Sequence, residues 1–173
     1  MPFESMNTPI EIERKFLIHM PDMEALVKLD NVRIKNIEQT YLLTRDKSTA
    51  RVRKISEDER ISFVKTVKKR ISALSHYEDE GEIDREQYEK ELKNADPQRS
   101  TIVKTRYAFP FCAHTVEIDV YPFWKDRAIL EIELADENES FDIPKFIKVI
   151  KEVSDDGRYK NTNLAVKIPM DNI

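Results

Sequence analysis

The chain has little glycine, a single cysteine and no long apolar run, and each shortage excludes a class of protein. With two glycines in 173 residues, there are no glycine-rich loops to bind phosphates through backbone amides, so any phosphate must be bound by side chains. Cys112 alone excludes an internal disulfide and a cysteine-based zinc site and is typical of a reducing compartment. No stretch approaches 18 apolar residues and the start lacks a signal-peptide pattern, so we expect a cytoplasmic protein without a membrane segment.

Charge is abundant but nearly balanced. The 29 basic and 33 acidic residues give a net charge of −4, which argues against binding to duplex nucleic acid. Hydrophobic residues make up 40% of the chain, which is enough for the core of one domain. We therefore predict a single domain over residues 1–173, with a disordered start at residues 1–8.

Segments with a period of two recur along the chain and predict strands. The expected strands cover residues 10–18, 37–44, 48–56, 60–68, 83–92, 101–109, 114–122 and 128–135. Helices are expected at 21–27, where Asp22 is a candidate N-cap, and at 141–153. Residues 68–82 are expected to form a mobile loop, whose Lys68-Lys69-Arg70 cluster is either a solvated surface or a positive lip that steers anions. Eight strands with few short helices predict a mainly β fold, a closed or nearly closed antiparallel barrel.

One face of the predicted strands is charged, and its charges are sorted by sign. Alternation places the two glutamates and the lysine of Glu11-Ile-Glu13-Arg-Lys15 on one face of the first strand. Basic pairs stand on the third and sixth strands and further acidic pairs on the seventh and eighth, namely Arg51 and Arg53, Lys104 and Arg106, Glu117 and Asp119, and Glu131 and Glu133.

Two interpretations of this charged face compete. It is either the solvated outside of the barrel or the lining of its lumen, with the aliphatic face packed against helices. A solvated face usually mixes charge signs, so the sorting favours the lumen. Crowded carboxylates disfavour ionisation, and a hard divalent cation bound by their oxygens would relieve this. Arginine and lysine side chains opposite them would bind phosphate oxygens.

The motifs that carry these residues resemble, in order, those of the CYTH superfamily, the triphosphate tunnel metalloenzymes. Matching segments run through nearly the whole chain: Glu11-Ile-Glu13-Arg-Lys15, Gln39-Thr-Tyr41, Arg51-Val-Arg53, Lys65, Arg85-Glu-Gln-Tyr88-Glu89, Lys104-Thr-Arg106, Glu117-Ile-Asp119, Glu131-Ile-Glu133 and Arg158-Tyr-Lys160-Asn161. In length and closing motif the chain is most similar to the small bacterial inorganic triphosphatases. Gln87 departs from that subgroup, in which we expect a carboxylate that supports metal binding.

The resemblance implies an eight-stranded tunnel that binds a triphosphate and a divalent metal, Mg²⁺ or Mn²⁺. It implies a substrate-binding set of Lys15, Arg51, Arg53, Lys65, Arg85, Lys104, Arg106 and Lys160. The implied metal ligands are Glu11, Glu13, Glu117, Asp119, Glu131 and Glu133, and the implied catalytic residues are Lys15, Arg53, Lys65 and Glu133. Glu89 and Arg158 are further candidates for the site.

The function implied by the resemblance is metal-dependent hydrolysis of a phosphoanhydride bond in inorganic triphosphate or a related triphosphate compound. The alternatives are an adenylate cyclase of the class IV type, a thiamine triphosphatase, and a polyphosphate- or nucleotide-binding module without turnover. The full set of acidic residues favours an enzyme, because binding alone needs only the basic residues. We expect a monomer or a homodimer with a small-molecule partner.

Overall fold

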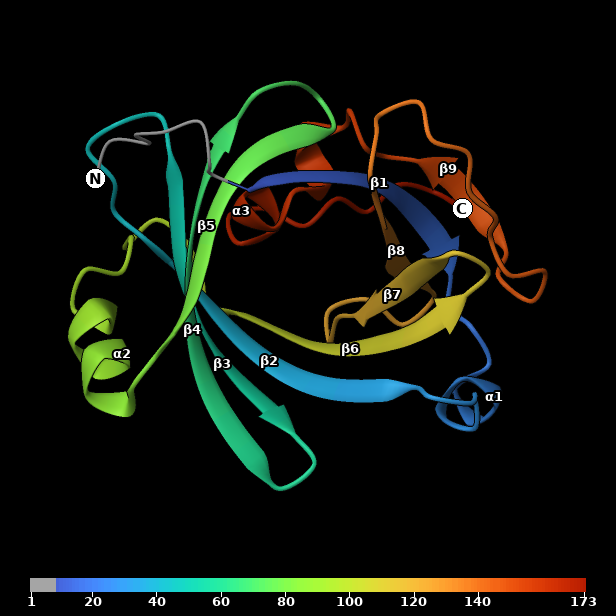
Figure 1. Cartoon of the computed structure of the whole chain (residues 1–173), viewed down its shortest axis with the longest axis horizontal. Helices are drawn as coiled ribbons and strands as arrows, with labels where there is room; N and C mark the ends of the chain where they lie inside the picture. Colours follow the sequence, from blue (N-terminus) through green and yellow to red (C-terminus); the bar gives the residue numbers. More distant parts are fainter. Residues whose placement is uncertain (1–8) are drawn as a thin grey trace.

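The computed structural model describes residues 9–173, which form a closed antiparallel β-barrel with one added strand (Figure 1). The barrel strands are β1 (Ile10–His19), β2 (Arg33–Leu42), β3 (Thr49–Glu57), β4 (Arg60–Arg70), β5 (Ser75–Ile83), β6 (Ile102–Phe111), β7 (His114–Val120) and β8 (Arg127–Leu134). Their order is β5-β4-β3-β2-β6-β7-β8-β1, and pairing of β1 with β5 closes the ring. The predicted eight-stranded antiparallel barrel is confirmed.

The remaining elements are short. β9 (Val149–Glu152) pairs with the second half of β1. The helices are α1 (Met23–Val27), α2 (Arg85–Leu92), the 3₁₀ turn η1 (Gly157–Tyr159) and α3 (Asn161–Leu164). In the described part of the chain, no helix is long and apolar enough to cross a bilayer. The expected disorder of residues 1–8 lies outside the described residues.

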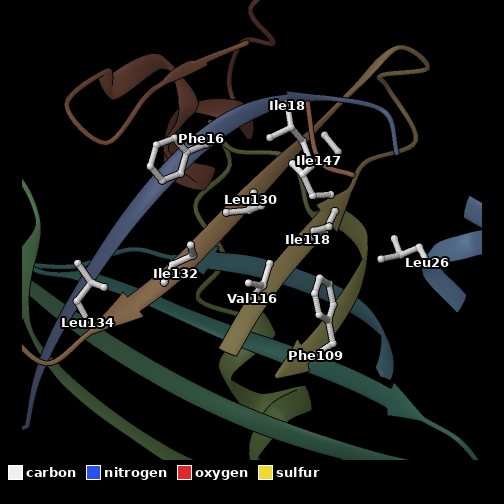
Figure 2. Close-up of a cluster of buried hydrophobic side chains, with 11 residues drawn as sticks. Phe16, Ile18, Leu26, Phe109, Val116, Ile118, Leu130, Ile132, Leu134 and Ile147 are labelled. Atoms are coloured by element: carbon white, nitrogen blue, oxygen red, sulfur yellow. The ribbon is translucent and has the colours of Figure 1, made fainter. Parts of the chain in front are cut away.

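The aliphatic face of β1, β6, β7 and β8 points outward and is covered there (Figure 2). Ile118 and Leu130 are fully buried in this cluster, which Leu26 of α1 and Ile147 of the C-terminal region join. Each such side chain contributes about 1.5–3 kcal/mol through burial. Because strand side chains alternate between faces, burying this face on the outside turns the charged residues of the same strands into the lumen.

The predicted helix at 21–27 is confirmed as α1. The side chain of Asp22 accepts hydrogen bonds from the backbone nitrogens of Glu24 and Ala25, at 3.0 and 3.2 Å. This N-cap satisfies amide donors that have no partner inside the helix.

The predicted strand at 83–92 is wrong, because these residues form helix α2. Asp84 caps the helix by accepting a hydrogen bond from the backbone nitrogen of Gln87 at 2.7 Å. Tyr88 and Leu92 are four residues apart and share one face, which packs on Phe63 and the outer side of the barrel. The alternating charges between them are the solvent side of a short helix.

Two further boundaries differ from the sequence expectations. The expected mobile loop at 68–82 is mostly strand, since β4 continues to Arg70 and β5 closes the barrel in place of the predicted strand at 83–92. The expected helix at 141–153 is also wrong: Pro144 lacks a donor and disfavours the helical conformation of Ile143. Ile143 instead packs against the outer cluster, and Val149–Glu152 form β9.

An apolar cluster, here called the end cluster, joins the inside of the barrel to the C-terminal region. Its members include Leu17, Tyr41 and Tyr121 from the barrel region and Tyr159 and Leu164 from η1 and α3. All five are at most 4% exposed. The end cluster therefore holds η1 and α3 against the barrel, and Figure 1 shows α3 within the outline of the ring of strands.

Candidate active site

The strand order sorts the inward charges into two continuous halves of the barrel. The basic half is β4, β3, β2 and β6, and the acidic half is β7, β8, β1 and β5. Inward cations of the basic half are Lys68, Arg70, Arg51, Arg53, Lys104 and Arg106; inward carboxylates of the acidic half are Glu117, Asp119, Glu131, Glu133, Glu11, Glu13, Glu78 and Glu80. Lys15 of β1 is an inward cation within the acidic half; apart from it, these charges are separated by sign in space as they are along the sequence.

A cavity of about 390 Å³ lies between the two halves. Its basic lining includes Lys15, Arg51, Lys68, Arg70, Arg106 and Lys160, and its acidic lining consists of Glu11, Glu13, Glu117, Glu131 and Glu133. The volume is in the range of about 300–1,000 Å³ that is usual for small-molecule sites. The lining suits an anion together with a cation.

A buried ion triad of Lys104, Arg106 and Asp119 lies at the junction of the halves, and of these three only Arg106 lines the cavity. Asp119 is fully buried and its Oδ2 lies 2.6 Å from Nζ of Lys104, while its Oδ1 lies 2.7 Å from Nε of Arg106. Burial alone would raise the pKa of Asp119, but Arg106 and Lys104 outweigh it and the pKa is lowered. Burial lowers the pKa of Lys104 to about 8, against the opposing effect of Asp119. Both oxygens of Asp119 are therefore engaged by cations.

Glu13 and Glu131 form a coupled pair of carboxylates beside Lys15. The Nζ of Lys15 is 3.4 Å from Oε1 of Glu131. Burial, followed by repulsion from Glu131, raises the pKa of Glu13 to about 8. Burial opposes ionisation of Glu131 as well, but Lys15 and Arg106 outweigh it and hold its pKa well below the usual range. A proton shared by this pair therefore favours Glu13, while Glu131 is held in its ionised form.

Lys68 and Arg53 connect the basic half to carboxylates of β5. Lys68 forms ion pairs with Glu11 and with Glu78, the latter at 3.0 Å. Arg53 lies 2.7 Å from Glu80. Burial, followed by repulsion from Arg51, lowers the pKa of Arg53 to about 10. The sequence reasoning missed Lys68, Glu78 and Glu80 because it placed them in a loop; their period-two spacing was the available signal.

Arg51 and Glu133 have no ion-pair partner among residues 9–173, although both line the cavity. The Nε of Arg51 is enclosed and has no hydrogen-bond acceptor there. Partial burial, with repulsion from Glu11 and Glu117, raises the pKa of Glu133. One unpaired side chain of each sign therefore faces the same space.

Lys65 does not point into the lumen, so its predicted place in the site is wrong. It shares its face of β4 with Phe63 and Val67, which pack outside the barrel against α2. Its Nζ lies 2.8 Å from Oε1 of Glu91 on that helix. The inward residues of β4 are Thr66, Lys68 and Arg70, so the lumenal lysine is three positions further along the strand.

Arg85, Glu89 and Arg158 also lie outside the lining of the cavity. Arg85 and Glu89 are on α2, where the guanidinium of Arg85 is 5.3 Å from the ring centroid of Phe63. Gln87 is on the same helix, so its departure from the expected carboxylate lies away from the lumen. The corrections for Arg85 and Glu89 follow from residues 85–92 being a helix in place of the predicted strand.

Arg158 is held by two carboxylates of the C-terminal region. Its guanidinium lies 2.7 Å from Asp156 and 2.9 Å from Asp171. Lys160, two residues later, does line the cavity as expected.

The acidic lining fits a hard divalent cation in its donor chemistry. Carboxylate oxygens are the ligands that Mg²⁺ and Mn²⁺ prefer, and Glu133 is free of protein partners among the described residues. In this part of the chain, no three His, Cys, Asp or Glu side chains are arranged closely enough to hold a metal. Several of these carboxylates are occupied by cations instead, as Glu11 is by Lys68 and Glu117 by Arg106.

Comparison with known proteins agrees with this architecture. Residues 9–159 match the family model of the CYTH domain. Two crystal structures of NE1496, one named a hypothetical protein and one an inorganic triphosphatase, are each 29% identical to this chain. They cover 92% of it, and 99% and 97% of their own chains, with TM-scores of 0.56 and 0.55.

A conserved hypothetical protein from Pyrococcus furiosus, 24% identical, covers 74% of this chain and 80% of its own with a TM-score of 0.57, and shares the fold. Among curated proteins, none matches the chain. The family match covers most of the sequence and includes all eight barrel strands. The chain belongs to the CYTH domain family.

Proposed function

We propose that this protein is a metal-dependent triphosphatase that hydrolyses a phosphoanhydride bond of inorganic triphosphate, or of a related triphosphate compound, inside the barrel. The observation that carries the proposal is the unpaired guanidinium of Arg51 in a cavity with a basic and an acidic half. An enclosed donor without an acceptor, such as the Nε of Arg51, is costly, and a polyanion would supply the missing acceptor. The similarity to NE1496, named an inorganic triphosphatase, supports this choice.

The basic half would bind and orient the phosphate chain. Arg51, Lys68 and Arg106 line one side of the cavity, and their donors neutralise charge on phosphoryl oxygens, including charge that develops on the leaving group. Arginine offers two donors in a plane that matches a phosphate edge. This chemistry is positioning and electrostatics, and it needs no side-chain nucleophile.

The acidic half would hold the metal, through Glu11, Glu13 and Glu133 with Glu117 and Glu131 beside them. When bound there, a divalent cation neutralises phosphate charge and acidifies a water molecule for attack. Lys15 keeps Glu131 ionised.

Binding of substrate and of metal would be coupled through the existing ion pairs. Lys68 is paired with Glu11, and Arg106 with Glu117. A phosphate chain that takes over the donors of these cations releases the two carboxylates as ligands. Binding of the phosphate chain therefore favours binding of the metal, and binding of the metal favours that of the phosphate chain by the same factor.

The test is phosphate release from inorganic triphosphate, ATP and thiamine triphosphate, measured side by side with Mg²⁺, with Mn²⁺ and with a chelator. The proposal expects turnover of at least one of these compounds, highest for inorganic triphosphate, and loss of turnover with the chelator. Cyclic AMP as the main product from ATP would favour the cyclase instead. Tight binding without turnover of any compound would favour the binding module.

A further inference from the structure

One buried polar residue of the cavity has no role in the proposed reaction so far. Asn161, the first residue of α3, is 8% exposed and lines the cavity beside Lys160. Its side-chain oxygen Oδ1 accepts a hydrogen bond of 2.7 Å from the hydroxyl of Tyr121. Tyr121 is 1% exposed and belongs to the end cluster, so this hydrogen bond joins the apolar end of the barrel to the cavity.

The amide nitrogen of Asn161 has no partner in the described part of the chain and is not enclosed. It therefore reaches the volume that the residue lines. A side-chain amide has two N–H donors, and buried polar groups are normally hydrogen-bonded. A ligand with acceptor oxygens would supply the hydrogen-bond partner that this side-chain amide lacks.

We propose that Asn161 is a phosphate-binding residue, whose amide donates a hydrogen bond to an oxygen of the triphosphate, and that Tyr121 is the positioning residue that fixes this amide. The inference rests on the proposed function. A neutral donor has an advantage at this place, because cations already crowd it. Burial, followed by repulsion from Arg70 and Lys15, lowers the pKa of Lys160, so an amide adds a donor without adding repulsion.

The position of Asn161 also indicates which phosphoryl group it contacts. Tyr41 and Val153 line the cavity and are members of the end cluster, which the Tyr121 hydrogen bond ties to Asn161. Asn161, Tyr41 and Val153 are all buried, so this side of the cavity is enclosed and suits the compact end of the substrate rather than a bulky organic group. We therefore place the terminal phosphoryl group at Asn161, with the rest of the substrate toward the exposed lining residues Lys47 and Arg70.

The test is calorimetric binding of inorganic triphosphate and of ATP, without divalent metal, to the full chain and four variants. Asn161→Ala removes the donors, Asn161→Asp replaces them by a carboxylate of the same shape, and Tyr121→Phe removes only the positioning hydroxyl. Tyr159→Phe is the matched control, because its hydroxyl donates to Asp171 at 2.8 Å from within the same end cluster. Thermal unfolding of each variant shows that it is folded.

Because Asn161→Ala removes a hydrogen bond to a charged oxygen, we expect it to weaken binding about tenfold or more. Asn161→Asp should weaken it further, Tyr121→Phe by a smaller factor, and Tyr159→Phe should leave it unchanged. The loss should be the same factor for inorganic triphosphate and for ATP, and kcat/KM should fall with the affinity. Wild-type affinity in folded Asn161 variants, or in Tyr121→Phe if those fail to fold, would overturn the assignment while leaving the proposed function intact. A larger loss for ATP than for triphosphate would overturn the terminal placement. Absence of binding to the wild-type chain would overturn the proposed function itself.

Discussion

Replacing Arg51 by methionine should make the ligand-free protein more stable and the ligand-bound protein less stable than wild type. Arg51 has an enclosed Nε without an acceptor and no carboxylate partner in the described part of the chain. An enclosed unsatisfied donor costs about 1–3 kcal/mol, and an apolar side chain of similar length removes that cost. For a chain of this size, each kcal/mol corresponds to about 2–4 °C in Tm, so we expect a rise of about 2–12 °C without ligand.

With inorganic triphosphate present, the order should reverse for any ligand-free gain below about 2.3 kcal/mol, which is the difference between the two stabilisations that follow. At a concentration one hundred times the wild-type Kd, the ligand stabilises the wild type by about 2.7 kcal/mol. If the substitution weakens binding one hundredfold, the variant gains only about 0.4 kcal/mol under the same conditions. Melting curves with and without triphosphate, in the absence of metal, measure both effects.

Arg53→Met is the matched control for this experiment. Arg53 lies on the same face of β3 and its Nε is likewise enclosed without an acceptor, but its Nη2 is paired with Glu80 at 2.7 Å. Its removal leaves Glu80 without a cation, with only the hydroxyl of Thr66 still donating to it at 2.7 Å, so the ligand-free Tm should be lower than that of Arg51→Met. A fall in the ligand-free Tm of Arg51→Met below wild type would contradict the prediction, because it would show that Arg51 stabilises the ligand-free fold as an ordinary structural cation.

Three further predictions concern other parts of the molecule. Lys68→Met should lower kcat/KM for triphosphate by about 10²–10³, as expected for loss of an electrostatic donor, whereas Lys65→Met should lower it less than threefold, because Lys65 faces α2; equal losses would contradict the register of β4. Asp171→Asn should lower the Tm at pH 7, because Lys151, Tyr159 and Arg158 hold the pKa of Asp171 below its usual range. The stabilisation from ionised Asp171 is present above the pKa of this group in the unfolded chain and is lost as pH falls through its pKa in the folded protein. The difference in Tm between wild type and variant should therefore shrink below about pH 4. A constant difference down to pH 2 would contradict this role of Asp171. Raising the ionic strength from 0.01 to 0.15 M should slow association of triphosphate, because cations line the cavity; a rate independent of salt would show that they do not steer it.

Strand parity, together with the sorting of charges by sign, predicted an antiparallel barrel and much of its charged lining, although the predicted strand at 83–92 is helix α2. Residues such as Arg51 and Glu131 flank buried aliphatic neighbours, and this contrast fixes their side of the sheet. Parity misplaced Lys65. This lysine shares its face of β4 with Phe63 and Val67, and that face is the outer one, which packs against α2. Parity shows which residues share a face, but only packing against α2 shows which face is inside.

The errors around residues 68–92 have one physical origin. β5 has only one buried residue, Ser75, so it lacks the apolar alternation by which a strand is recognised. α2 is short and buries only Tyr88, so its charges alternate as they do in a strand. The decisive interactions are non-local: the pairing of β5 with β1, and the contact of Tyr88 with Phe63.

We propose that the basic half of the barrel binds the phosphate chain and that the acidic half binds the metal. Crystals grown with Mn²⁺ and a non-hydrolysable triphosphate analogue test it most directly, because anomalous scattering locates the manganese independently of the phosphorus atoms. We predict manganese beside Glu11, Glu133 and their acidic neighbours, and phosphoryl oxygens within hydrogen-bond distance of Arg51 and Arg106. Phosphates bound outside the barrel, or manganese bound away from the acidic half, would contradict the account.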